Sequence, residues 1–143
     1  MQATAGALLL TGILGLISGV RLGSVQGLIG GGLLIGSLLL HEIGHVLMAQ
    51  SFGVRVKAVG ICLKGAYTRR LQSPVPGVEL AIAAAGPAAN LLLFLWLRDG
   101  NSLMKWVAML NLVLAISNLV PLRYSDGARI VESWRALRRT SPV

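Results

Sequence analysis

The feature that most constrains this chain is a set of apolar segments long enough to cross a lipid bilayer. A spanning α-helix needs about 20 predominantly apolar residues. Of the 143 residues, 55% belong to the hydrophobic set and 13% are charged, which is too apolar for an ordinary soluble domain. We therefore expect an all-α integral membrane protein with one membrane domain over 1–143. Its four transmembrane helices are predicted at about 3–20, 25–51, 78–97 and 103–122.

The first apolar segment has the length of a secretory signal peptide, but its flanks differ from one. Met1 to Thr4 carry no basic side chain, and no convincing small-residue cleavage site follows Leu16. We expect this segment to be retained as a span.

The connection between the second and third spans has a different pattern. Apolar and basic residues alternate from Val54 to Ala58, which is typical of a strand. Gly65 permits a turn, and residues 67–71 can return as a second strand. We expect a short β-hairpin at the membrane surface over 53–72.

The C-terminal segment 127–139 is amphipathic. Ile130, Trp134 and Leu137 fall on one helical face, while arginines occupy much of the rest. We expect an interfacial helix, and a solvated basic tail is the alternative.

The formal net charge of +8 suggests a membrane topology rather than a nucleic-acid partner. The basic residues lie between and after the apolar segments and are not clustered with aromatic side chains. Most of them share one side of the predicted bundle, so the positive-inside rule places both termini in the cytoplasm. We expect a bacterial inner (plasma) membrane. Cys62 is the only cysteine, so no intramolecular disulfide can form.

A candidate metal motif, His41-Glu42-Ile43-Gly44-His45, lies inside the second predicted span. Imidazoles at i and i+4 share one helical face and can bind one zinc ion. Glu42 can take a proton from a water that zinc activates. These are the only two histidines in the chain, and ionisable groups in hydrocarbon cost several kcal/mol unless compensated. The setting favours a hydrolytic zinc site over a chance pattern.

A catalytic zinc usually takes a third protein ligand, and few residues can supply one. The chain has only five acidic residues. Glu42 is assigned, Asp99 lies on the opposite side, and Glu79 and Glu132 belong to the third span and the tail. Asp126 remains, although a turn aspartate is the commoner role for such a residue alone.

Two further polar sequences fall at a similar depth. Gly86-Pro87-Ala88-Ala89-Asn90 lies about eight to twelve residues into the third span, and the stretch from Asn118 to Asp126 closes the fourth. Asn90 and Asn118 need hydrogen-bond partners in hydrocarbon. For Asn90, a role in joining helices is as good an interpretation as a direct functional role.

Together these sequences resemble the site-2 protease family, intramembrane metalloproteases that cut transmembrane segments of their substrates. The resemblance rests on the His41 to His45 motif, on Gly86 to Asn90, and on Asn118-Leu119-Val120-Pro121 followed by Asp126-Gly127. It covers about 34–130. We expect a compact form without a PDZ or other accessory domain.

The resemblance implies roles for particular residues. His41, His45 and Asp126 would bind one Zn²⁺ per chain, Glu42 would be the catalytic acid and base, and Asn118 would assist at the reacting carbonyl. The hairpin around Gly65 and Tyr67 would lie near substrate access and pair with an unwound substrate. Structural support is expected from Gly86, Pro87, Asn90 and Pro121. Arg123 and Ser125 depart from the family pattern, which puts the shape of the loop before Asp126 in question.

The implied function is hydrolysis of peptide bonds within or near transmembrane segments, as in regulated intramembrane proteolysis. The partners implied are a transmembrane protein substrate and the lipid bilayer, with a regulatory membrane partner or a homo-oligomer left open. A zinc-binding membrane regulator without proteolytic activity is the alternative.

Overall fold

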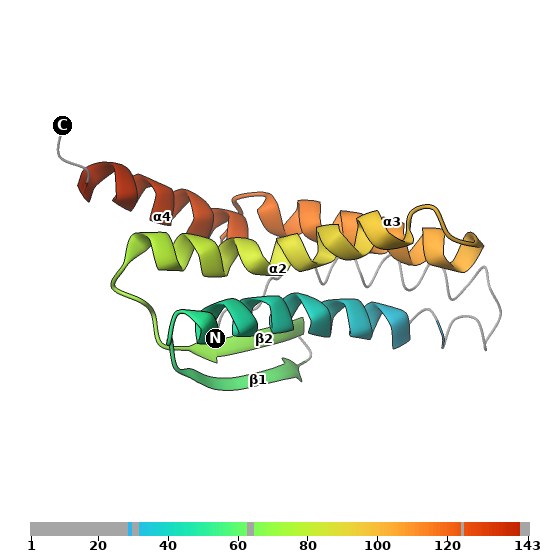
Figure 1. Cartoon of the computed structure of the whole chain (residues 1–143), viewed down its shortest axis with the longest axis horizontal. Helices are drawn as coiled ribbons and strands as arrows, with labels where there is room; N and C mark the ends of the chain where they lie inside the picture. Colours follow the sequence, from blue (N-terminus) through green and yellow to red (C-terminus); the bar gives the residue numbers. More distant parts are fainter. Residues whose placement is uncertain (1–28, 30–31, 63–64, 124, 141–143) are drawn as a thin grey trace.

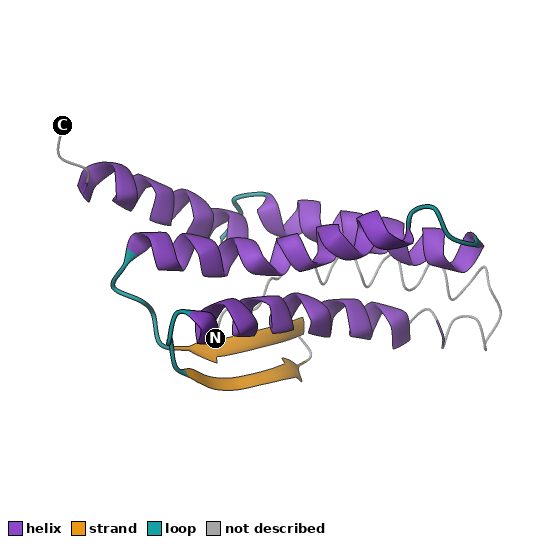
Figure 2. Ribbon diagram, viewed as in Figure 1, coloured by secondary structure: helices purple, strands orange, loops and turns teal. Residues whose placement is uncertain are grey.

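The computed structural model describes residue 29 and residues 32–62, 65–123 and 125–140. The predicted span over 3–20, and the start of the one over 25–51, lie outside the described residues. Within these ranges the chain is a helical bundle with a small sheet beside one helix (Figures 1 and 2). In chain order the elements are the helix Gly32–Ser51, β1 (Val56–Cys62), β2 (Gly65–Arg70), α2 (Pro76–Leu97), α3 (Ser102–Leu119) and α4 (Asp126–Thr140).

Three of these helices are long and apolar enough to cross a membrane: Gly32–Ser51, α2 and α3. At 1.5 Å per residue they measure roughly 27 to 33 Å, close to the thickness of the hydrocarbon core. Large apolar side chains stand exposed on all three, with Trp96 at 77% and Leu47 at 62% exposure. Contiguous exposed apolar surface of this kind suits a lipid-facing position and is unusual in a soluble monomer.

Small residues let the helices approach closely. Five of the nine buried hydrophobic residues in the described part of the chain are alanines, among them Ala49, Ala83 and Ala108. Gly44 faces α2 so tightly that an added Cβ would lie 2.7 Å from the backbone oxygen of Ala85. Close approach through small residues is the usual way in which membrane helices gain packing contacts.

Local chemistry explains where α2 begins and where α3 begins and ends. Pro76 occupies the first turn of α2, where its missing N–H costs nothing. Asn101 caps α3 by accepting a hydrogen bond from the Met104 backbone N–H at 3.0 Å. At its other end α3 stops at Leu119, because Pro121 favours an extended conformation for the residue before it.

The strands β1 and β2 pair antiparallel, with Cys62 opposite Gly65 and an irregularity between Val56 and Ala58. A salt bridge joins the end of β2 to α2. The guanidinium of Arg70 donates two hydrogen bonds to the carboxylate of Glu79, at 2.6 and 2.7 Å. The backbone N–H of Ser73 donates to the same carboxylate. The sheet is therefore tied to the first turn of α2.

Helix α4 runs beside the first half of α2, roughly continuing the direction of α3 (Figure 1). Near its end, Leu137 lies 3.9 Å from where a side chain on Gly77 would begin. Helix α4 thus packs against α2.

Candidate metal centre

The structure brings together three side chains from the first and last described helices. His41 and His45 project from the Gly32–Ser51 helix, and Asp126 is the first residue of α4. His41 Nε2 lies 3.0 Å from Asp126 Oδ2, His45 Nε2 lies 3.3 Å from the same oxygen, and the two Nε2 atoms are 3.1 Å apart. All three residues are at most 6% exposed.

These separations fit one zinc ion. Zinc takes imidazole nitrogen and carboxylate oxygen at roughly 2.0 to 2.1 Å, and tetrahedral geometry then sets neighbouring ligand atoms about 3.3 Å apart. The donor set of two imidazoles and a carboxylate is one that catalytic zinc sites use. The cluster can therefore hold one metal ion and leave a position for another ligand.

The second nitrogen of each imidazole is held by an oxygen atom of α2. His41 Nδ1 lies 2.6 Å from Asn90 Oδ1, and His45 Nδ1 lies 2.7 Å from the backbone oxygen of Ile82. An amide or carbonyl oxygen can only accept, so each Nδ1 carries the proton and donates. Each Nε2 is then left for the metal, as in most histidine metal sites.

Helix α2 makes room for the imidazoles with a glycine. A Cβ on Gly86 would collide with His45 Nε2 and would lie 2.7 Å from His41 Nε2. Pro87 follows, buried inside the same helix. Position 86 therefore cannot carry a side chain while the ligands keep this arrangement.

Ser125 and Gly127 shape the turn that delivers Asp126. The Ser125 hydroxyl accepts from the Ala128 backbone N–H at 3.1 Å, which caps α4, and lies 2.7 Å from the Val120 carbonyl oxygen as a donor. A Cβ on Gly127 would collide with the Leu119 backbone oxygen. The serine that departs from the family pattern thus stabilises the turn. A serine directly before an amphipathic segment is a recognisable helix-start signal.

The carboxylate of Asp126 is electrostatically suited to bind a cation. It is 4% exposed and lies 3.0 and 3.3 Å from two imidazole nitrogens that carry lone pairs, so three electron-rich atoms face one buried point. An ionised carboxylate is the form that binds metal.

The other predicted site residues fall at varying distances from this cluster. Glu42 is 6% exposed and directly follows His41. Asn118 is 3% exposed, and its amide donates to the Leu114 carbonyl oxygen at 2.9 Å within α3. Pro121 lies exposed in the α3–α4 connection. Gly65 and Tyr67 lie in β2, opposite Cys62 and Gly60.

Two residues that the sequence analysis overlooked contact the surroundings of His41. Asn111 of α3 is fully buried and accepts a hydrogen bond from Asn90 at 2.7 Å, and Ser37 is 2% exposed beside them. The available signal was an asparagine in the middle of an apolar helix, where a polar side chain is expensive without partners.

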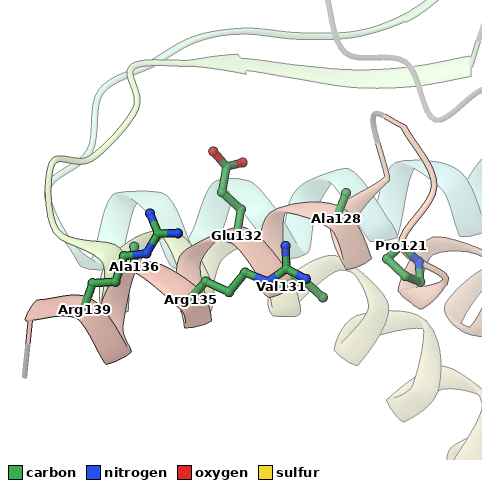
Figure 3. A pocket seen from close by; sticks show the side chains of 7 residues that line it. All are labelled: Pro121, Ala128, Val131, Glu132, Arg135, Ala136 and Arg139. Carbon is green, nitrogen blue, oxygen red and sulfur yellow. The ribbon is translucent and has the colours of Figure 1, made fainter.

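An open hollow of about 900 Å³ runs along one side of α4 (Figure 3). None of the three candidate ligands lines it, so it is separate from the metal centre. Its lining residues are Pro121, Ala128, Val131, Glu132, Arg135, Ala136 and Arg139.

Several known proteins that this chain resembles are named as metalloproteases. The family model described as "Peptidase family M50" matches residues 31–98. A Synechocystis protein named as a zinc metalloprotease is 35% identical over 120 residues, covering 76% of this chain and 32% of that protein. A zinc metalloprotease of Methanocaldococcus jannaschii is 31% identical over 111 residues, covering 71% of this chain and 32% of that protein.

A solved structure also matches. The site-2 protease from Methanocaldococcus jannaschii superimposes with a TM-score of 0.71 at 25% identity, covering 92% of this chain and 65% of that chain. The chain spans about a third of the length of the curated relatives, 32% in both cases above.

Proposed function

Because the chain belongs to peptidase family M50, together with the site-2 proteases, we propose that it is an intramembrane zinc metalloprotease. Its substrates are membrane proteins, which it cuts within or near their transmembrane segments. One observation carries this proposal: a buried cluster of His41, His45 and Asp126, with Glu42 beside it, lies among helices apolar enough to span a bilayer.

The depth of the cluster supports a substrate bond inside the membrane. His45 bonds to Ile82 and both imidazoles face Gly86, which follow Pro76 by six and ten residues. At 1.5 Å per residue this is about 9 to 15 Å from the start of α2. A peptide bond would have to reach that depth, and a helical substrate would have to unwind to expose its carbonyl carbon.

We assign the chemical roles as follows. His41, His45 and Asp126 would hold one zinc ion, which would supply Lewis acidity toward a water and the scissile carbonyl. Glu42 takes the proton of the attacking water and later donates it to the leaving amine. Asn118 stabilises the developing negative charge on the carbonyl oxygen.

The surroundings of the site complete the proposal. The β1–β2 hairpin, with Gly65 and Tyr67 on β2, lies near substrate access and offers an edge with which an unwound segment can pair. The proposal includes the span expected at about 3–20, which lies outside the described residues, and it places both termini in the cytoplasm of a bacterium with the protein in the inner membrane. Labelling of Cys62 by a membrane-impermeant reagent tests this orientation, and access only from the outer side would invert it.

The decisive test replaces the base without disturbing the ligands. In Glu42→Gln, cleavage of co-expressed single-span proteins should be lost, while bound zinc stays at the wild-type level. Glu132→Gln on the exposed side of α4 makes the same chemical change away from the cluster and should leave both quantities unaltered.

Two outcomes would count against the proposal. Undiminished cleavage by Glu42→Gln would remove the assigned base. Zinc bound by a wild-type protein that cuts no member of the panel would favour the alternative, a zinc-binding regulator. Glu42 itself argues against that alternative, since storage of a metal needs no buried carboxylate beside the ligands.

A further inference from the structure

A continuous chain of buried hydrogen bonds leads away from the candidate ligand His41. Its Nδ1 atom contacts Asn90 Oδ1 at 2.6 Å, and Asn90 Nδ2 contacts Asn111 Oδ1 at 2.7 Å. Asn111 Nδ2 in turn contacts Ser37 Oγ at 3.0 Å. Asn90 and Asn111 are fully buried. This series of hydrogen bonds therefore links the Gly32–Ser51 helix, α2 and α3 through side chains alone.

Three backbone carbonyl groups fix the direction of this chain. Asn90 Nδ2 lies 3.3 Å from the Ser37 carbonyl oxygen, and Asn111 Nδ2 lies 2.9 Å from the Val107 carbonyl oxygen. The Ser37 hydroxyl donates to the Leu33 carbonyl oxygen at 3.0 Å. A carbonyl oxygen can only accept, so each amide must turn its NH₂ group toward these oxygens.

The donor-to-acceptor direction of these hydrogen bonds determines which imidazole nitrogen of His41 carries the proton. If the Asn90 amide were reversed, its oxygen would face the oxygens of Ser37 and Asn111, and two buried hydrogen bonds would be lost. In the observed orientation an oxygen faces His41 Nδ1, so Nδ1 is the protonated nitrogen. The lone pair then lies on Nε2, which points at Asp126.

The two candidate histidine ligands differ in this respect. His45 Nδ1 is held by the backbone oxygen of Ile82, which is a fixed part of α2. His41 depends on a side-chain amide that could rotate. Among the described residues, Asn111 Oδ1 and the Ser37 backbone carbonyl oxygen hold that amide in place. The hydrogen bonds of Asn90 therefore do more than join helices, because one of them fixes the ring of a candidate metal ligand.

We propose that Asn111, supported by Ser37, is a positioning residue for the metal centre: through Asn90 it orients His41 for binding zinc. The inference rests on the proposed function, because it assumes that zinc is the ion held there. It adds Asn111 and Ser37, which act through Asn90, to the residues that support the metal centre.

The test uses the full chain in detergent or bilayers, loaded with zinc. Asn111→Leu keeps the side-chain size and removes all three hydrogen bonds of the amide. We therefore expect zinc affinity, measured by competition with a chelator, to fall by about tenfold to a hundredfold. The Nδ1 proton of His41, observed by NMR with ¹⁵N-histidine, should move upfield and exchange faster with water. The His45 Nδ1 proton should not move, and with only two histidines in the chain both can be assigned.

Two further variants separate positioning from general loosening of the bundle. Leu114→Ala opens a void at a residue of α3 that is 1% exposed. It should lower thermal stability while leaving zinc affinity and the His41 resonance unchanged. Ser37→Ala removes only the hydroxyl and should shift both readouts in the same direction as Asn111→Leu, by less.

The two proposals fail in different ways. A wild-type chain that binds no zinc contradicts the proposed function. Wild-type zinc affinity and an unshifted His41 resonance in Asn111→Leu, or in Ser37→Ala if the first variant does not fold, contradict the positioning role.

Discussion

At the scale of single residues, the metal centre depends on the absence of a side chain at position 86. The two imidazoles occupy the space where a Cβ would lie. A methyl group there competes directly with the ring atoms that face the metal, and the rigid backbone of α2 leaves the rings as the only parts able to move.

We therefore predict that Gly86→Ala loses zinc binding while the helices still form. Zinc content of the purified protein, compared with its helical circular dichroism, measures the effect. Gly36→Ala is the matched control, because no atom lies within 4 Å of the added Cβ and alanine favours a helix by up to about 1 kcal/mol. Full zinc content in Gly86→Ala would show that the imidazoles adopt another arrangement.

The sequence reveals some residues of this centre and hides others for a physical reason. His41, Glu42 and His45 follow one another at helical spacing, so their common face can be predicted from local geometry. Asp126 can be singled out because the chain has few acidic residues. Asn111 and Ser37 come into contact only after three helices pack together, so no local sequence pattern predicts their hydrogen bond.

At the scale of secondary-structure elements, one ion pair connects the β-hairpin to the helical bundle. The side chains of Arg70 and Glu79 are only 7% and 11% exposed, and two guanidinium hydrogen bonds make the ion pair bidentate. Removing one partner of a buried ion pair lowers the free energy of unfolding by more than the pair contributes to it, because the other charge is left buried and unpaired.

We predict that Glu79→Gln destabilises the attachment of the hairpin by about 3 kcal/mol. Limited proteolysis within 63–72 should become faster, and the midpoint of thermal unfolding should fall. Asp99→Asn is the comparison: it breaks the Arg98–Asp99 pair, whose side chains are 53% and 87% exposed, and should change stability by less than about 0.5 kcal/mol. Equal behaviour of the two variants would mean that Glu79 does not hold the sheet.

The observed helix boundaries can be compared with those predicted from local sequence patterns. The third and fourth predicted spans, 78–97 and 103–122, correspond to helices Pro76–Leu97 and Ser102–Leu119. Helix α3 ends three residues earlier than predicted, because Pro121 stops it and the cap at Ser125 starts α4 shortly afterwards. Amphipathicity predicts a helix in the tail, but that pattern alone does not distinguish contact with a membrane surface from contact with α2.

At the scale of the whole molecule, the candidate ligands come from the first and last described helices. Anything that binds all three side chains must favour the assembled bundle over separated helices, by an amount that grows with its affinity.

We predict that removing metal with a chelator lowers the thermal unfolding midpoint of the purified protein in detergent, and that zinc restores it. The same treatment of His41→Ala should produce little change, since the variant lacks a ligand. Identical unfolding of the wild type with and without chelator would show that no metal contributes to its stability.

The separation of His41 and Asp126 along the chain, 85 residues, has a consequence in terms of polymer statistics. A metal bound to both acts as a reversible cross-link that closes most of the described chain into one loop. The entropy that such a closure removes from the disordered chain grows only slowly with loop length. The ion would thus constrain the chain much as a disulfide does, in a protein whose single cysteine cannot form one within the chain.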